Sequence, residues 1–193
     1  MSAPTEPRPD RRITPPVAVA IALPLLLARV VAGLGVATRF GRGAEPAPVA
    51  DTTPLAVAPV NAPAATGPDC LVVLAALQGD LPGGDATLPV REQAEPRQPG
   101  VQAWAAVSRP VVLRCGLPRP AELVPTSPLI EVDGVSWLTL DDGVPNPTVI
   151  TYVAVDRPVF VAVTTPTGLG NGPLQTISGV LGDTLPETPV PVR

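Results

Sequence analysis

TVITYVAVDRPVFVAVT, residues 148–164, is the segment with the clearest strand pattern in this chain. Valine recurs at alternate positions on both sides of Asp156-Arg157: Val149, Val153 and Val155 share one face with Thr151, and Val159, Val161 and Val163 share another. Alternation with a period of two is typical of a half-buried strand, and β-branched residues favour that conformation. We therefore predict a β-hairpin with strands over 148–155 and 158–164.

A second hairpin precedes this one. Asp133-Gly134 separates the apolar stretches 129–133 and 135–140, and an Asp-Gly pair between such stretches is a strong signal for a two-residue turn. Residues 111–115 form a further short apolar stretch typical of a strand, and 102–107 read as a short strand or a turn. The chain is therefore rich in strands that follow one another closely.

Two helices are predicted around these strands. Asp69 is a suitable N-cap for the apolar stretch 70–78, and residues 173–181 place their apolar side chains on one helical face. The combination predicts an α+β fold: a small antiparallel sheet of about five strands, with two short helices covering one face and burying the valines.

An apolar segment, residues 17–37, precedes this domain. Its 21 residues include eleven Val, Ile or Leu and one charge, Arg29. That length just spans a bilayer core of about 30 Å, while Arg29 would cost about 2.5–3.5 kcal/mol at its centre. We expect a transmembrane anchor that leaves the C-terminal domain outside the cell membrane. A cleaved secretory signal ending near Ala37, and a buried helix of a soluble protein, remain open alternatives.

Proline divides the rest of the chain, which contains 29 prolines in 193 residues. Each proline removes a backbone donor and disfavours helix in the residue before it. The predicted organisation is a polar cytoplasmic tail over 1–16, the membrane segment 17–37, a Pro-rich linker over 38–68, an extracytoplasmic domain over 69–182, and a Pro-rich tail over 183–193.

Cys70 and Cys115 are the only cysteines, and they enclose 44 residues. In an exported domain, one intramolecular disulfide is the default interpretation of such a pair. Two buried thiols and a reactive pair are the alternatives, although the Cys-x-x-Cys spacing of redox sites is absent.

Composition excludes several kinds of function. All 13 cationic side chains are Arg, and the absence of His removes the usual neutral-pH general base and the commonest metal ligand. After residue 37 there are 9 Arg against 15 Asp and Glu, a net charge of −6 that disfavours nucleic-acid binding. We expect no cofactor, no metal site and no enzymatic activity.

Several features of the sequence together resemble a family of proteins. They are PVVLRCGLPRP over 110–120, Trp104 six residues upstream of it, Cys70, and VDGVSWL over 132–138. This is an actinobacterial family of secreted or membrane-anchored proteins, defined as domain of unknown function 3515. The resemblance spans about 69–181 and implies an N-terminal membrane segment. The chain departs from the family pattern at Ala105, where members often have Gly. The family has no established activity, so the resemblance assigns no catalytic residue.

Four residues are candidates for contact with a ligand or partner. Arg109, Arg114 and Arg119 recur every five residues and could form a fork for an anionic group, and Trp104 offers an aromatic surface. Structural ion pairs and core packing are the simpler interpretations of these residues. We expect a membrane-tethered, non-enzymatic interaction or structural module of the cell envelope, with an envelope protein or a glycan as partner. A hydrolase or lyase built only on carboxylates, and a secreted small-ligand binding protein, are the alternatives.

Overall fold

The computed structural model describes Arg29 and residues 49–140 and 143–191. All of these except Arg29 belong to one compact unit, Pro48–Arg193. Within the described residues, no helix is both long enough and apolar enough to cross a bilayer. The predicted tail 1–16 and, apart from Arg29, the predicted membrane segment 17–37 lie outside the described residues, so these predictions stand as they were.

The unit is built on one antiparallel sheet of seven strands in the order β3-β4-β5-β9-β8-β7-β6. The strands are β3 (Val90–Arg91), β4 (Val101–Trp104), β5 (Val111–Leu117), β6 (Leu129–Val132), β7 (Val135–Leu140), β8 (Val149–Ala154) and β9 (Phe160–Pro166). A separate two-stranded hairpin consists of β1 (Leu81–Gly83) and β2 (Ala86–Leu88). The antiparallel α+β class is as predicted, with seven strands in the main sheet where about five were expected.

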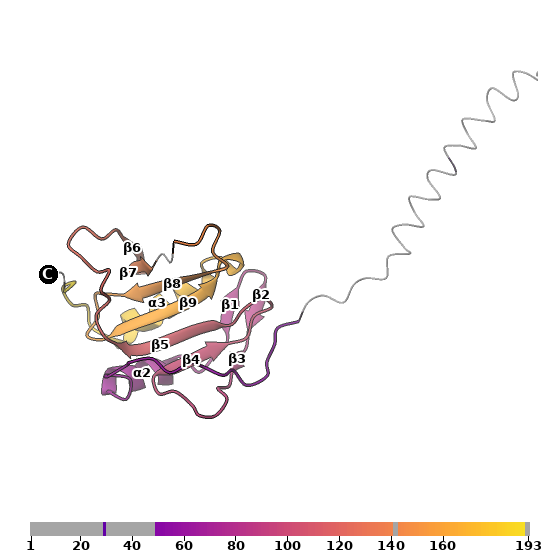
Figure 1. Cartoon of the computed structure of the whole chain (residues 1–193), viewed down its shortest axis with the longest axis horizontal. Coiled ribbons are helices and arrows are strands. Elements are labelled where there is room, and N and C mark those ends of the chain that lie inside the picture. Colours follow the sequence, from indigo (N-terminus) through magenta and orange to yellow (C-terminus); the bar gives the residue numbers. More distant parts are fainter. Residues whose placement is uncertain (1–28, 30–48, 141–142, 192–193) are drawn as a thin grey trace, which may run out of the picture. The chain divides into compact units, whose positions relative to one another are not determined.

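Two α-helices and one short 3-10 turn complete the unit. They are α2 (Pro68–Ala76), η1 (Thr167–Leu169) and α3 (Gly172–Thr184). In the view of Figure 1, α3 lies behind the sheet. Helix α3 contacts α2, the β1 strand, and the β6 and β7 strands. We call the side of the sheet that faces the helices the helix face, and the opposite side the open face.

Both predicted hairpins are present. Asp133 and Gly134 connect β6 to β7 with φ values of 46° and 72°, the left-handed conformation that a two-residue turn of this type requires. The other hairpin pairs β8 with β9 in the middle of the sheet, from Val149 opposite Pro166 to Ala154 opposite Val161. Strand β5 returns to pair with the other side of β9, so the predicted hairpin forms the centre of the sheet.

The valines of that hairpin divide between the two faces. Val161 and Val163 join the large core on the helix face, which also contains both tryptophans. Val153 and Val155 instead join a smaller cluster on the open face, around the fully buried Leu123. The expectation that two helices bury all these valines is therefore wrong for Val153 and Val155. These two face the side of the sheet opposite the helices, where an irregular segment containing Leu123 covers them.

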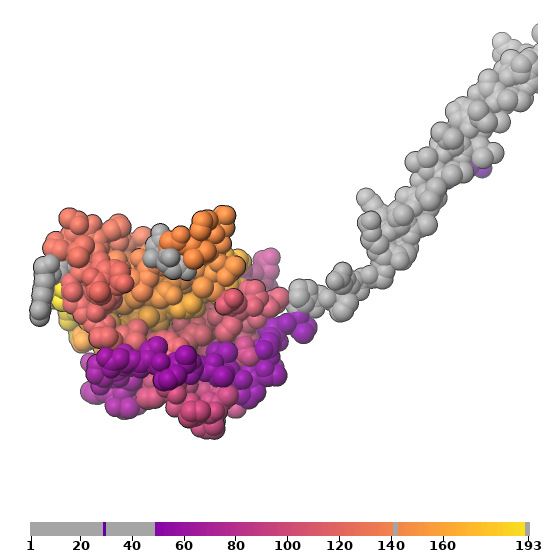
Figure 2. All heavy atoms as spheres, in the orientation of Figure 1, coloured from indigo at the N-terminus to yellow at the C-terminus, as the bar shows by residue number. Residues whose placement is uncertain are grey.

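Much of the predicted linker lies against the domain. We call residues 49–67 the docked segment; its purple spheres run across the sheet in Figure 2. Leu55 forms a parallel bridge with Gln93 beside β3, and the Arg91 guanidinium lies 2.7 Å from a carboxylate oxygen of Asp51. Farther along, the Ala64 N–H donates to the Gly116 carbonyl. The docked segment therefore covers the β3 edge of the sheet, which would otherwise expose unpaired backbone groups.

The C-terminal residues are also part of the domain. Helix α3 extends to Thr184, beyond the predicted end at 181, and the Leu185 that follows it is buried. The Thr188 N–H donates to the Asp156 carbonyl, and Val190 packs against the cluster on the open face. The described part of the predicted tail 183–193 therefore helps to close the open face.

Candidate functional site

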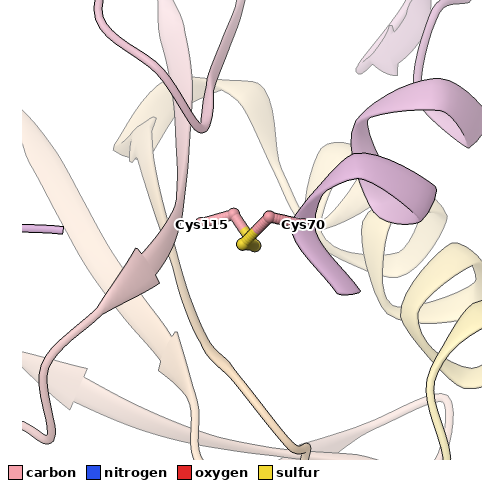
Figure 3. Close-up of a disulfide and its surroundings, with 2 residues drawn as sticks. All are labelled: Cys70 and Cys115. Atoms are coloured by element: carbon pink, nitrogen blue, oxygen red, sulfur yellow. A yellow bond between two sulfur atoms is a disulfide. The ribbon is translucent and has the colours of Figure 1, made fainter. Parts of the chain in front are cut away.

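The two cysteines form a disulfide between the first turn of α2 and the middle of β5, as Figure 3 shows. Their Cα atoms lie 5.6 Å apart, within the usual range for a disulfide, and both residues are buried. The predicted pairing of Cys70 with Cys115 is present in the structure. Because the bond joins the helix to the sheet inside the core, we assign it a structural rather than a redox role.

Trp104 does not lie where a ligand or partner would meet it. Its side chain is fully buried in the core on the helix face, and its indole N–H donates to the Gly79 carbonyl at 2.9 Å. A buried indole whose N–H has a partner is a packing residue. The prediction of Trp104 as a contact residue is corrected accordingly: the ring joins β4 to the chain that follows α2.

The three arginines make separate contacts and do not form a fork. Arg114 lies on the open face of β5, where its guanidinium donates to the Ala58 carbonyl of the docked segment at 3.2 Å. Burial beneath that segment lowers the pKa of Arg114. Arg119 donates to the carbonyls of Leu123 and Pro191. These two arginines hold other parts of the chain on the open face.

Arg109 differs from the other two. It is exposed in the connection between β4 and β5, and no ion pair joins it to a described residue. Of the three arginines predicted as contacts, Arg109 alone therefore remains fully available at the surface of the described chain.

Two arginines outside the predicted contact residues are buried. Arg157 pairs with Asp156 at 3.1 Å and donates to the Gly134 carbonyl at 2.8 Å. Asp156 in turn accepts from the Ser136 N–H at 2.7 Å. The pair thus ties the β8–β9 connection to the β6–β7 turn. In the sequence, Asp156-Arg157 has the appearance of an ordinary turn, and no local signal indicates its burial.

Arg91 is the other buried arginine, and it binds the docked segment. Besides its ion pair with Asp51, its Nε donates to the Thr53 carbonyl at 2.6 Å. Hydrogen bonds from the Thr53 hydroxyl and N–H, followed by the nearby guanidinium of Arg91, lower the pKa of Asp51. Asp51 therefore stays ionised, and the start of the docked segment is fixed by charge-assisted contacts.

A groove of about 560 Å³ lies beside the end of β7 and the start of β8. Most of its surface is apolar, and two threonines complete the lining. Its apolar and charged lining residues are Leu140, Val144, Pro147, Val149, Ile150 and Glu122. They come from three parts of the chain: the segment after β5, the end of β7, and the β7–β8 connection with the start of β8. The groove is partly open to solvent.

Charged residues are distributed unevenly along the described sequence of the domain. Residues 49–119 hold six acids and five arginines. The described residues of 120–191 hold six acids and a single arginine: Glu122, Glu131, Asp133, Asp156, Asp183 and Glu187, against Arg157. Arg157 is paired with Asp156, and Arg119 donates to the Leu123 and Pro191 carbonyls of this same part of the chain. Asp133 and Asp156 lie at the ends of β7 and β8 away from the groove, so Glu122 is the one acid among its described lining residues.

The chemistry available in the groove is limited. Glu122 is the one titratable side chain among its described lining residues, and none of them has a nucleophilic thiol or an imidazole. Within the described ranges, no three His, Cys, Asp or Glu side chains gather in a way that could hold a metal ion. Asp141 and Asp142, which directly follow β7, lie outside the described residues. The described lining offers apolar contact and one negative charge.

Comparison with known protein families identifies the family of this chain. A family model described as "Protein of unknown function (DUF3515)" matches residues 19–190. No curated protein and no solved structure matches the chain. The matched region includes every described helix and strand of the disulfide-bonded domain and begins inside the apolar segment 17–37.

Proposed function

This chain belongs to the DUF3515 family of proteins of unknown function, and we propose that it is a membrane-anchored, extracytoplasmic interaction module of the cell envelope. The observation that carries the proposal is the buried Cys70–Cys115 disulfide in a domain that also presents an open apolar groove. A stable structural disulfide is typical of proteins that fold outside the reducing cytosol. The groove gives such a domain a surface with which to bind.

The placement outside the membrane has further support. Residues 17–37 are long enough and apolar enough to act as an anchor or a signal, and the family match begins at residue 19, inside that segment. The family match therefore includes residues 19–37, nearly all of the apolar segment, as well as the folded domain. Residues 38–48 separate that segment from the docked segment.

A binding role fits the groove better than catalysis does. Acid–base hydrolysis without His needs two carboxylates that face one substrate. The described lining of the groove offers Glu122 alone, and the buried carboxylate of Asp156 is already paired with Arg157. We therefore favour a non-enzymatic module over a carboxylate-based hydrolase or lyase.

Binding of a small soluble ligand is a second possibility, favoured by the size of the groove. Its volume lies in the range of about 300–1,000 Å³ that is common for small-molecule sites. Such sites usually enclose most of the ligand surface, whereas this groove is open. The shape is better suited to a segment of another macromolecule that passes across it.

Photo-cross-linking in intact cells tests this function. A photoreactive amino acid would be introduced at Val144, which lines the groove, and separately at Val107, which does not. Val107 is a matched control for Val144, since 54% and 55% of their respective surfaces are exposed. We expect a discrete adduct with an envelope component from one or more exposed positions. The absence of any adduct in a wider scan of the exposed surface would refute an interaction module.

A further inference from the structure

We propose that β6 binds an extended strand of a partner protein, which pairs antiparallel with this outer edge of the sheet. The partner strand would place Arg or Lys opposite Glu131 and apolar side chains opposite Ile130 and Leu129. The inference rests on the proposed function and adds to it a surface and the chemistry of the partner. Unpaired backbone groups, two exposed apolar side chains and one exposed carboxylate of β6 support it.

The outer edge of β6 has backbone groups without partners. Strand β6 ends the sheet, and Ser136 of β7 lies opposite Glu131. The Ser136 N–H donates to the Asp156 carboxylate and its carbonyl accepts from the Val155 N–H, so both groups are used on the β8 side. The backbone groups of Glu131 therefore point away from β7, and alternation directs those of Leu129 the same way. No described residue forms a hydrogen bond with these outward groups.

The opposite edge of the same sheet shows how such groups are satisfied. Beside β3, the Leu55 N–H of the docked segment donates to the Glu92 carbonyl at 2.8 Å, and its carbonyl accepts from the Ala94 N–H at 2.9 Å. Unpaired groups of an edge strand are a ready template for an extended chain. The described chain supplies such a cover at β3 and none at β6, so a strand from another protein fits the β6 backbone.

The side chains of β6 specify that strand. Leu129 and Ile130 are apolar, yet 36% and 42% of their surfaces are exposed. Ile130 lies opposite Trp137 on the helix face, whereas Leu129 and Glu131 lie on the open face. Directly opposed side chains of an antiparallel pair are neighbours, so apolar residues of the partner can cover Leu129 and Ile130. Glu131 is exposed and has no ion pair with a described residue, and a cation opposite it would supply one.

The same carboxylate disfavours other strands, including a second copy of this chain. An apolar or acidic side chain opposite Glu131 would leave its charge unpaired or repelled. Antiparallel pairing of two β6 edges about Ile130 would place Leu129 of each copy against Glu131 of the other. Arg157, which donates to the turn after β6, is buried and already paired with Asp156. A partner strand that brings its own cation is therefore a better match than a second copy.

Amide hydrogen exchange, resolved by NMR on the full-length chain in a non-ionic detergent, tests this pairing. The probe is the peptide STRVVTS with blocked termini. We expect saturating peptide to slow exchange at the Leu129 and Glu131 amides by at least about tenfold, because these N–H groups point at the added strand. The Ile130 and Val132 amides face β7 and should change by less than about twofold.

Altered peptides separate backbone pairing from side-chain contact. An N-methyl group on the second valine blocks an N–H that would bond to β6, and should weaken binding by about tenfold or more. An N-methyl group on the first valine points away from β6 and is its matched control. The peptide STEVVTS, with Glu in place of Arg, should bind at least about fivefold more weakly than STRVVTS.

Charge reversal on the protein locates the binding. Glu131→Arg should lower the affinity for STRVVTS and raise the affinity for STEVVTS, each by about fivefold or more. Glu122→Arg reverses an equally exposed class of side chain in the groove, outside β6, and should change neither affinity by more than about twofold.

The outcomes separate this inference from the proposed function. No slowing at Leu129 and Glu131, equal effects of the two N-methyl groups, or no exchange of preference in Glu131→Arg would overturn the strand site. Slow exchange at both amides without peptide, together with a dimer in analytical ultracentrifugation, would show that a second copy occupies the edge, and would also overturn it. If cross-links in cells form only at positions outside β6, the interaction module stands and this inference fails.

Discussion

Opening the Cys70–Cys115 bridge should cost about 4 kcal/mol of unfolding free energy, since the residues are 45 apart and the chain-entropy model gives that value for a loop of this length. Domains of this size are usually stable by about 5–15 kcal/mol. Loss of the bridge would therefore remove a large part of the margin, and would lower the melting temperature by about 10–15 °C.

The assay is urea denaturation of the full-length chain, in constant non-ionic detergent, with and without a reducing agent. Trp104 and Trp137 are the only tryptophans and both are fully buried, so their fluorescence reports loss of the core. Reduction keeps both sulfur atoms in place and isolates the effect of the cross-link. The double variant Cys70→Ala with Cys115→Ala adds the loss of two buried sulfur atoms, and should be less stable than the reduced protein.

Two results would refute this reasoning. If the oxidised and reduced chains unfold within about 1 kcal/mol of each other, the bridge does not constrain the unfolded chain as the loop length requires. If the reducing agent also lowers the unfolding midpoint of the double alanine variant, which has no disulfide, the agent acts on something other than the bridge. Either result would remove the structural role assigned to these cysteines.

Three further substitutions test the rest of the fold. Asp51→Asn should speed hydrogen exchange at the Leu55 amide at neutral pH, because the Asp51 carboxylate helps to hold the docked segment. In the unsubstituted chain, this amide should be protected from exchange above the ordinary pKa of 3.8. The protection should be lost only as the pH falls through the lowered pKa of Asp51. Exchange unchanged by the substitution would refute the role of this carboxylate. Gly116→Ala should lower the free energy of unfolding by more than about 1 kcal/mol in urea denaturation, because φ is +88° there and a Cβ would lie 2.2 Å from a backbone nitrogen of the docked segment. An unchanged unfolding midpoint would contradict that docking. Ser178→Ala should cost about 1–3 kcal/mol in thermal unfolding, because it leaves the buried indole N–H of Trp137 without its acceptor, and a loss below about 0.5 kcal/mol would count against that bond.

The parts of the fold that follow local patterns could be predicted from the sequence. Alternating valines and the Asp133-Gly134 pair placed both hairpins, since strand period and turn conformation depend on neighbouring residues. The hairpin of β1 and β2 was not predicted, because strands of three residues are too short to show a period.

Features that depend on contacts distant in the sequence were missed. Residues 49–67 contain many prolines and have the composition of a linker, yet the glycine at 116 leaves room for Ala64 and Ala65 against the sheet. The burial of Arg157 likewise depends on the Gly134 carbonyl, 23 residues away. The groove is assembled from three separate stretches, so none of them alone indicates it.

The placement of the domain outside the membrane can be measured with one engineered amine. The chain contains no lysine, so Thr87→Lys in the exposed strand β2 adds a single ε-amine. A membrane-impermeant N-hydroxysuccinimide ester is applied to intact cells, and peptides are read by mass spectrometry. We predict that the amine at position 87 is modified in intact cells, while the lysines of a cytosolic marker protein react only after lysis. Modification at position 87 only after lysis would contradict an extracytoplasmic domain.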